Sequence, residues 1–341
     1  MFDIRSIIAT LIRFFSSLFA MSVTQKEKLE LEIASIVKQI FFDVVDPKPS
    51  DWPKVVWHYT SCQTLLSILD SKSIWATHIS CLNDTSECRH LFDLFFERFA
   101  QVAGNNANLS ALYNYVVAQK GKNHAWESDW FVTSFCAEGD DLNLWRAYAG
   151  ADGGVSIGFN STELVCQAWG REREERGGSL GQPETYLLPV VYEGKKKQDL
   201  VKKLVSSLNN LFLRGLGGRN PTDWAKQLWA SWEDQLLVVA PLLKHRGFES
   251  EKEWRLIKKV PDSLQSSLKY LARANTITRH FPLAVLALAV DSPPVLPIVE
   301  IKVGPGRHQE LTKVNVEKCL RSKGYDGKVR VSCSNIPFRL L

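Results

Sequence analysis

The segment Phe248–Leu256, FESEKEWRL, carries a charged residue at every second position from Glu249 to Arg255, over a length typical of one strand. In a β-strand this order places Glu251, Glu253 and Arg255 on one face, with Trp254 behind them. Such a row predicts one of two things. It is an exposed, salt-bridged face, or it is a site in which Arg255 keeps one carboxylate ionised while the other acts on a substrate. Two further stretches are candidate partners for this row, VWHYT at 56–60 and the segment from VTSFC to LWRAYAG between 132 and 150.

The composition is that of an ordinary folded protein. With 341 residues, 45% of them hydrophobic and 23% charged, the chain is long enough for one or two domains with a large core. The net charge of +5 suits an anionic substrate but is weaker than the clustered excess typical of nucleic-acid-binding proteins. The seven cysteines include no Cys-x-x-Cys pair, which predicts reduced thiols in the cytoplasm.

The N-terminal residues 1–24 form an apolar extension interrupted by Arg13. The stretch is marginal for a membrane span, which needs about 20 apolar residues. Asp3 lies where a signal peptide would be basic. The two methionines of the chain are Met1 and Met21, and an ordinary polar sequence begins at the second. We therefore expect residues 1–24 to be an optional upstream start or a membrane-associated segment, followed by an amphipathic helix and a linker over residues 25–54.

From residue 55 onward, short β-rich runs alternate with helical patterns. We expect strands at 55–59, 74–77, 131–136, 155–159, 187–192, 247–259, 285–290, 299–303 and 329–333. We expect helices at 64–71, 91–100, 142–149, 196–214, 222–243 and 308–323. With no internal repeat, this predicts one α+β domain over residues 55–341, with a central mixed or antiparallel sheet, flanking helices and a helical insertion at about 193–244.

Two motifs with possible chemistry have a simpler structural interpretation. His78, Cys81, Cys88 and His90 have side chains that suit zinc, but their spacing lacks the usual paired ligands, so we expect no metal. The G-x-S-x-G match around Ser156 would need a strand before its first glycine and a sharp turn at the serine. Here the apolar alternation runs straight through the serine, which predicts a strand; a serine hydrolase using Ser156 remains an alternative.

Aromatic residues and a histidine accompany the acidic row. Trp145 and Tyr148 stand three residues apart on the expected helix 142–149, where they would be core residues or a platform for a flat ring. His58 shares one face of its expected strand with Thr60, opposite Tyr59. Strand histidines are commonly core or edge residues, so His58 is of functional interest only together with these partners.

Seven segments together resemble the bacterial family known as domain of unknown function 2971. They are HYTSCQTLLSIL at 58–69, LNDTSE at 82–87, TSFC at 133–136, LWRAYAGADGGVSIGF at 144–159, KHRGFESEKEWRL at 244–256, VEIKVGP at 299–305 and SNIPFR at 334–339. The resemblance spans roughly residues 55–340. Because this family has no settled activity, the resemblance implies a fold more than a function.

The chain also resembles, more distantly, the ADP-ribosyltransferases. His58 and Thr60 match a first strand that holds the nicotinamide-side ribose and amide, and Ser134 loosely matches a serine strand. Glu251 and Glu253 match an E-x-E motif. The resemblance implies an oxocarbenium-like cation stabilised by a carboxylate as the nicotinamide–ribose bond breaks. The departures are the sequence Thr-Ser-Phe in place of Ser-Thr-Ser and the long insertion before Lys244.

The resemblance to ADP-ribosyltransferases implies a glycosyl-transfer enzyme that uses NAD as a co-substrate, in a setting of bacterial defence or toxicity. The expected catalytic residues are Glu253, Glu251 and His58, and the expected NAD-binding residues are His58, Tyr59, Thr60, Ser134, Trp145, Tyr148 and Arg255. The alternative is a non-catalytic module that binds a nucleotide or another small ligand. The acceptor, protein or nucleic acid, is left open, and membrane contact through residues 1–23 is an additional expectation.

Overall fold

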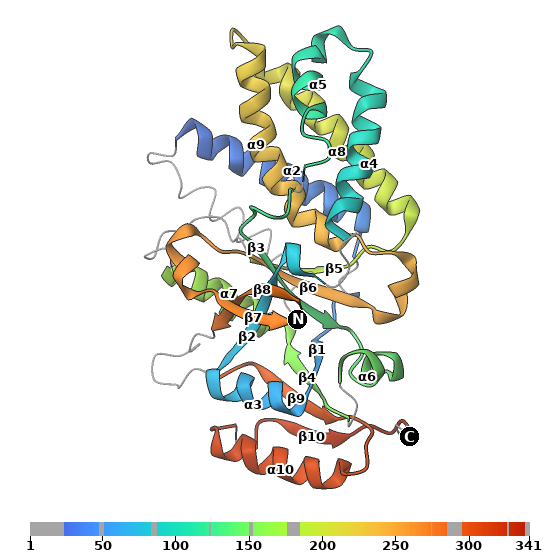
Figure 1. Ribbon diagram of the computed structural model, residues 1–341, viewed down its shortest axis with the longest axis vertical. Coiled ribbons are helices and arrows are strands. Elements are labelled where there is room, and N and C mark those ends of the chain that lie inside the picture. Colours follow the sequence, from blue (N-terminus) through green and yellow to red (C-terminus); the bar gives the residue numbers. More distant parts are fainter. Residues whose placement is uncertain are drawn as a thin grey trace. The chain divides into compact units, whose positions relative to one another are not determined.

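The computed structural model describes residues 24–47, 51–82, 87–122, 124–149, 153–175, 185–273, 275–284, 295–325 and 327–337 (Figure 1). The apolar extension at 1–23 and the strand expected at 285–290 lie outside these ranges. No helix within them is long and apolar enough to cross a membrane.

The chain divides into two compact units. The helical unit comprises Met1–Trp52, Ile79–Trp130 and Val190–Gly247, and the sheet unit comprises Pro53–His78, Phe131–Pro189 and Phe248–Leu341. The segment expected as an insertion, about 193–244, belongs to the helical unit together with the N-terminal helix.

The helical unit contains α2 (Gln25–Val45), α4 (Glu87–Ala103), α5 (Ser110–Val117), α8 (Gly194–Gly215) and α9 (Pro221–Val239). Local sequence explains where its helices begin. The hydroxyl of Thr24 accepts the amide of Glu27 and the Glu27 carboxylate accepts the amide of Thr24, a capping box at the start of α2. Asn220 caps α9, whose first residue is proline.

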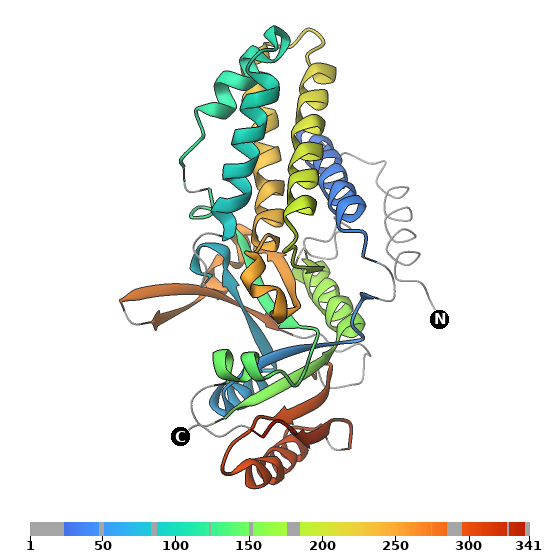
Figure 2. The ribbon, with the colours of Figure 1, turned by 90° about the vertical axis from the view of Figure 1, so that its right-hand side faces the viewer.

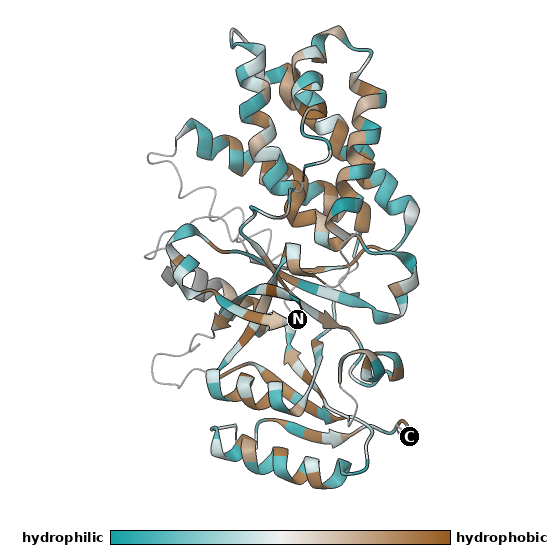
Figure 3. Cartoon of the chain, viewed as in Figure 1, coloured by the Kyte–Doolittle hydropathy of each residue, from teal (hydrophilic) through white to brown (hydrophobic). Residues whose placement is uncertain are grey.

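The helices of this unit pack through aromatic side chains. Phe95 stacks on Phe99 at 6.0 Å and lies 5.8 Å from Trp229, and all three are almost fully buried. In Figure 3 the hydrophobic segments concentrate where these helices face one another. Each such side chain contributes about 1.5–3 kcal/mol when it leaves water, so this core accounts for much of the unit's cohesion.

In the described part of the chain, the sheet unit contains ten strands. They are β1 (Val55–Thr60), β2 (Ser73–His78), β3 (Trp130–Cys136), β4 (Val155–Asn160), β5 (Thr185–Pro189), β6 (Glu253–Lys259), β7 (Lys269–Arg273), β8 (Thr276–Ala284), β9 (Ile298–Val303) and β10 (Arg330–Cys333). Their order is β10-β9-β4-β1-β3-β2-β8-β7, with β6 beside β3 and β5 beside β6. The β9–β10 pair is parallel, and the pairs around β1, β2, β4 and β8 are antiparallel.

The sheet unit also contains the helices α3 (Cys62–Ser71), α6 (Leu142–Tyr148), α7 (Ser161–Glu175) and α10 (Gln309–Ser322). α3 contacts β2 and β4, α6 contacts β1, α7 contacts β4, and α10 contacts β9 and β10. The predicted α+β class, with a largely antiparallel central sheet and flanking helices, is confirmed. α5, α7, β7 and β8 were not expected from the sequence.

The strand register separates the predicted site residues onto two faces of the sheet. Tyr59 stands opposite Ser156 on β4, and Trp57 stands opposite Cys136 on β3. Because successive side chains alternate, these four residues share one face, here called the Tyr59 face, and His58 lies on the other. This division decides which candidates share a site.

Candidate functional site

The strand that carries the acidic row is shorter than predicted: a strand was expected from about residue 247, but β6 begins only at Glu253. The preceding residues Arg246–Glu251 form a 3₁₀ turn, closed by a 3.2 Å bond from the amide of Lys252 to the carbonyl of Glu249. Lys252 has a φ of 43°, in the left-handed region that side-chain-bearing residues enter at a cost of about 1–2 kcal/mol. The prediction that Glu251 shares a strand face with Glu253 is therefore wrong: the turn interrupts the period-2 alternation between them.

Glu253 and Arg255 form a buried, bidentate ion pair. The Nε of Arg255 donates to Oε1 of Glu253 at 2.7 Å and its Nη2 donates to Oε2 at 3.1 Å. The side chains are only 3% (Arg255) and 4% (Glu253) exposed. Both carboxylate oxygens of Glu253 are thus held by the guanidinium, a geometry that stabilises the ionised forms of both groups.

The alignment of β6 with β3 places this ion pair on the Tyr59 face. The amide of Ala137, just after β3, donates to the carbonyl of Lys252, just before β6, at 3.1 Å. Strands that meet in this way run antiparallel, so Glu253 lies beside Cys136 and Arg255 beside Ser134. Since Cys136 is opposite Trp57, the ion pair shares the face of Tyr59 and not the face of His58.

Glu251 is accessible and contacts an accessible tyrosine. The hydroxyl of Tyr148, at the end of α6, donates to Oε1 of Glu251 at 3.2 Å, and Tyr148 is 41% exposed. Next to them, Nζ of Lys252 lies 3.0 Å from Oε1 of Glu138, with both side chains more than half exposed. We call Tyr148, Glu251, Lys252 and Glu138 the Tyr148–Glu251 site. It offers a carboxylate, a phenol and a cation that solvent reaches.

Tyr59 and Trp145 are core residues. Their rings meet edge to face at 4.7 Å and are 6% and 3% exposed. The Tyr59 hydroxyl donates to the carbonyl of Glu138 at 2.9 Å and accepts the amide of Asp141 at 3.0 Å, and burial raises its pKa. The pair thus fixes the loop that leads into α6, and through it the position of Tyr148.

His58 lies on the opposite face of the sheet from Glu253. Its Nδ1–H donates to the carbonyl of Ser134 at 3.0 Å, and its ring meets Phe135 edge to face at 6.0 Å. Burial lowers the pKa of His58, which favours the neutral imidazole. Thr60, on the same face, is buried, whereas the Ser134 side chain is exposed on the Tyr59 face. The structure therefore does not bring His58 and Thr60 together with the two glutamates.

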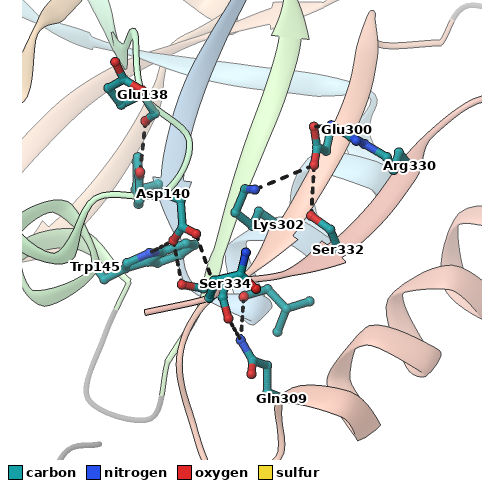
Figure 4. A network of polar contacts seen from close by, with 12 residues as sticks. Glu138, Asp140, Trp145, Glu300, Lys302, Gln309, Arg330, Ser332 and Ser334 are labelled. Atoms are coloured by element: carbon teal, nitrogen blue, oxygen red, sulfur yellow. Dashed lines mark hydrogen bonds and ion pairs between the residues drawn. The ribbon is translucent and has the colours of Figure 1, made fainter. Parts of the chain in front are cut away.

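Asp140, which lies just before α6, joins this helix to the C-terminal segment (Figure 4). Asp140 Oδ1 accepts from Nε1 of Trp145 at 2.8 Å and from the Ser334 hydroxyl at 2.5 Å, and its Oδ2 accepts from the amide of Asn335 at 3.3 Å. Asp141 is the actual cap, accepting the amide of Asn143 at 2.8 Å. In the sequence, the signals available for this contact are the paired acids Asp140 and Asp141 and the SNIPFR segment at 334–339.

A second polar cluster lies on β9 and β10 (Figure 4). Glu300 accepts from the Ser332 hydroxyl at 2.9 Å and pairs with Arg330, and Lys302 lies 3.9 Å from it and 6.0 Å over the ring of Trp57. This cluster borders the Tyr59 face because Lys302 stands opposite Ser156. Sequence reasoning missed it, since a Glu and a Lys two residues apart on a strand are common.

Neither alternative motif has the geometry its chemistry requires. Ser156 lies in the middle of β4, paired on both sides and fully buried, so the strand predicted through the serine is confirmed and no sharp turn exposes it. His78 is fully buried, accepts from Nη2 of Arg279 at 3.1 Å on Nδ1 and meets Phe131 edge to face. The described residues contain no group of three or more His, Cys, Asp or Glu side chains arranged to hold a metal ion.

Comparison with known proteins finds one family. Residues 144–256 match the family model described as protein of unknown function (DUF2971). This confirms, for that part of the chain, the resemblance to the domain of unknown function 2971. The matched segment runs from α6 to β6 and so contains Tyr148, Glu251 and the Glu253–Arg255 pair. No curated protein and no solved structure gives a significant match. The description of DUF2971 assigns no activity, so any function for the Tyr148–Glu251 site rests on its geometry.

Proposed function

We propose that the chain binds NAD at the Tyr148–Glu251 site and cleaves its nicotinamide–ribose bond, transferring the ADP-ribosyl group to an acceptor or to water. The observation that carries this proposal is the contact between the Tyr148 hydroxyl and the Glu251 carboxylate, both accessible to solvent. A carboxylate at such a position can stabilise a cationic sugar transition state by its charge.

In the proposed reaction the bond between ribose C1′ and the nicotinamide nitrogen breaks, and its electron pair leaves with nicotinamide. The ribose becomes an oxocarbenium-like cation, which the Glu251 carboxylate stabilises by its charge. The acceptor oxygen or nitrogen then forms a bond to C1′ and loses its proton to solvent. Tyr148 fixes the orientation of Glu251 and provides an aromatic surface for the nicotinamide ring.

The flanking residues have supporting roles in this proposal. Lys252 is an exposed cation next to Glu251 and would bind the diphosphate, with Glu138 as its partner in the free protein. Glu253 and Arg255 hold the first residues of β6 in place through their buried pair. The acting acid is thus Glu251, because Glu253 has both oxygens occupied by Arg255.

A second candidate is a non-catalytic module that binds a nucleotide without turning it over. The observation that favours it is the buried Glu253–Arg255 pair. Both carboxylate oxygens of Glu253 bind Arg255, and a ligand cannot reach this pair. In this case Tyr148 and Lys252 would recognise the ligand and Glu251 would only position Tyr148.

One experiment separates the two candidates. Purified full-length protein is incubated with NAD, nicotinamide release is followed by chromatography, and the midpoint of thermal unfolding is measured with and without NAD. Release of nicotinamide above the no-enzyme rate, together with a raised midpoint, supports the enzyme. A raised midpoint without release supports the binding module. An unchanged midpoint and no release contradict both.

A further inference from the structure

α6 is a helix of only seven residues, Leu142–Tyr148, and its last residue is the tyrosine of the Tyr148–Glu251 site. Isolated helices shorter than about 12–15 residues are marginal in water, so tertiary contacts decide whether α6 keeps its shape. Figure 1 shows α6 near the end of β10, and Figure 2 shows this side of the sheet unit from the front. The contacts between α6 and the segment that follows β10 therefore affect the position of Tyr148.

Asp140, in the loop before α6, links the helix to this segment. Its Oδ1 accepts the indole Nε1–H of Trp145 and the hydroxyl of Ser334, and its Oδ2 accepts the amide of Asn335. Figure 4 shows the carboxylate between the helix and the C-terminal segment. Hydrogen bonds to a carboxylate are roughly twice as strong as those between neutral groups. Asp140 is therefore well suited to hold the two segments together.

Ser334 is itself fixed to the sheet unit through every one of its polar groups. Its amide donates to the carbonyl of Val303 on β9 at 2.8 Å, and its carbonyl accepts from Nε2 of Gln309 on α10 at 3.0 Å. Its hydroxyl donates to Asp140 and accepts the amide of Ile336 at 3.2 Å. Because β9 and α10 hold the backbone of Ser334, its hydroxyl is a fixed donor for the Asp140 carboxylate.

An apolar contact accompanies these hydrogen bonds. Ile336 packs against a buried cluster, which consists of Tyr59, Cys136, Leu144, Trp145 and Ala149. Three of these residues, Leu144, Trp145 and Ala149, belong to α6 or form its C-cap. Tyr148 lies outside the cluster and is 41% exposed. The C-terminal segment thus contacts the part of α6 that anchors the helix and leaves the tyrosine of the site accessible.

We infer that Asp140 is a positioning residue for the Tyr148–Glu251 site and that Ser334, 194 residues away in the sequence, is its anchor. The carboxylate holds α6 against the C-terminal segment, and the helix held in this way directs the Tyr148 hydroxyl to Glu251. The site is complete only while the C-terminal segment is bound to Asp140. The effect on turnover rests on the proposed function, whereas the ordering of α6 by Asp140 does not.

The test compares two hydroxyl deletions two residues apart in the full-length protein. Ser334→Ala removes the donor to Asp140, and Ser334→Thr restores a hydroxyl. Ser332→Ala is the matched control, because the Ser332 hydroxyl donates to Glu300 at 2.9 Å and not to Asp140. Two further variants change the acceptor: Asp140→Asn keeps one acceptor oxygen, whereas Asp140→Leu keeps none.

Amide hydrogen exchange, followed by mass spectrometry, reports the order of α6 without any ligand. The peptide that covers α6 should exchange roughly tenfold faster in Ser334→Ala and in Asp140→Leu than in the wild type, because a hydrogen bond to a charged group is lost. Ser332→Ala should exchange like the wild type. Ser334→Thr and Asp140→Asn should lie closer to the wild type than Ser334→Ala and Asp140→Leu do.

Two results of this measurement would overturn the inference. One is equal exchange of the α6 peptide in Ser334→Ala and in Ser332→Ala. The other is an increase of the same size in every peptide of Ser334→Ala, because that result would indicate a general loss of stability and not the release of α6.

Turnover separates positioning from folding. In Ser334→Ala the kcat of nicotinamide release should fall severalfold, and Ser334→Thr should recover most of it. The KM for NAD should stay within about twofold, because Lys252, which would bind the diphosphate, lies outside α6. If the wild type releases nicotinamide, an unchanged kcat in Ser334→Ala would overturn the positioning role. If the wild type releases none, the proposed function is contradicted, and hydrogen exchange alone decides whether Asp140 orders α6.

Discussion

Arg255 holds both carboxylate oxygens of Glu253, at 2.7 and 3.1 Å, while Glu251 lies outside the strand and contacts Tyr148 instead. Two glutamates that the sequence places in one motif thus have different environments. A single left-handed residue, Lys252, causes the difference. Each part of this arrangement has a measurable consequence.

Breaking the buried ion pair should be costly. Removing the charge of one partner leaves the other buried without compensation, which costs about 3–5 kcal/mol. We expect Glu253→Gln and Arg255→Met each to lower the free energy of unfolding by an amount of this order. The double variant Glu253→Leu/Arg255→Met should lose less than either single variant. Urea unfolding of the three proteins measures this; additive losses would contradict a coupled pair.

The left-handed backbone at Lys252 predicts an order of stability among small replacements. Glycine enters this region freely, whereas any residue with a Cβ pays about 1–2 kcal/mol. Lys252→Gly should therefore be more stable than Lys252→Ala by about 1 kcal/mol. Both variants lose the same exposed ion pair with Glu138, so the comparison cancels that effect. Equal stability in urea would show that Lys252 is not in the left-handed region.

The free energy of unfolding should depend on pH through His58. Burial lowers the pKa of His58 in the folded chain below its ordinary value of about 6.5. As the pH falls through this value, the unfolded chain binds a proton that the folded imidazole does not. Stability should therefore fall by up to about 1.4 kcal/mol per pH unit, until the lowered pKa is reached. Urea unfolding of wild type and His58→Phe at a series of pH values measures this dependence. Between pH 7 and the lowered pKa of His58, the free energy of unfolding should depend less steeply on pH in His58→Phe. An identical slope in the two proteins would contradict the prediction.

The Tyr148 hydroxyl should matter for the ligand more than for the fold. Tyr148→Phe removes one exposed hydrogen bond to Glu251, which contributes about 0.5–1.5 kcal/mol at most. We expect a small change in urea stability. Under the proposed function, nicotinamide release should slow severalfold, because Glu251 loses its orienting partner. An unchanged rate would leave the Tyr148–Glu251 contact without a catalytic purpose.

The sequence predicted most of the sheet but not the arrangement at the site. Strong alternation placed β1, β3, β4 and β9 to within a residue or two, because their buried positions are unambiguous. β7 was missed because residues 269–272 are all exposed and show no alternation of buried and exposed positions. β8, its partner in the hairpin, was missed as well.

The acidic row shows why the finer geometry was beyond the sequence. In FESEKEWRL a charged residue stands at every second position from Glu249 to Arg255, yet the strand starts only at Glu253. The amide of Lys252 closes the turn by a hydrogen bond to Glu249, and Lys252 has a positive φ. Both features depend on tertiary structure and do not follow from the periodicity of the sequence. The opposition of His58 and Glu253 depends likewise on the register of β1 with β3 and of β3 with β6. The order of the motifs along the chain does not determine this strand register, and so it does not show which face of the sheet each residue occupies.

The most direct test of the central claim compares two variants of the same turn. Glu251→Gln removes the proposed acting carboxylate, and Glu249→Gln removes an exposed carboxylate two residues away. With saturating NAD, the maximal rate of nicotinamide release by Glu251→Gln should fall by about 10²–10³-fold, a typical effect of losing electrostatic stabilisation. Glu249→Gln should retain the wild-type rate. Wild-type turnover in Glu251→Gln would contradict the proposed function.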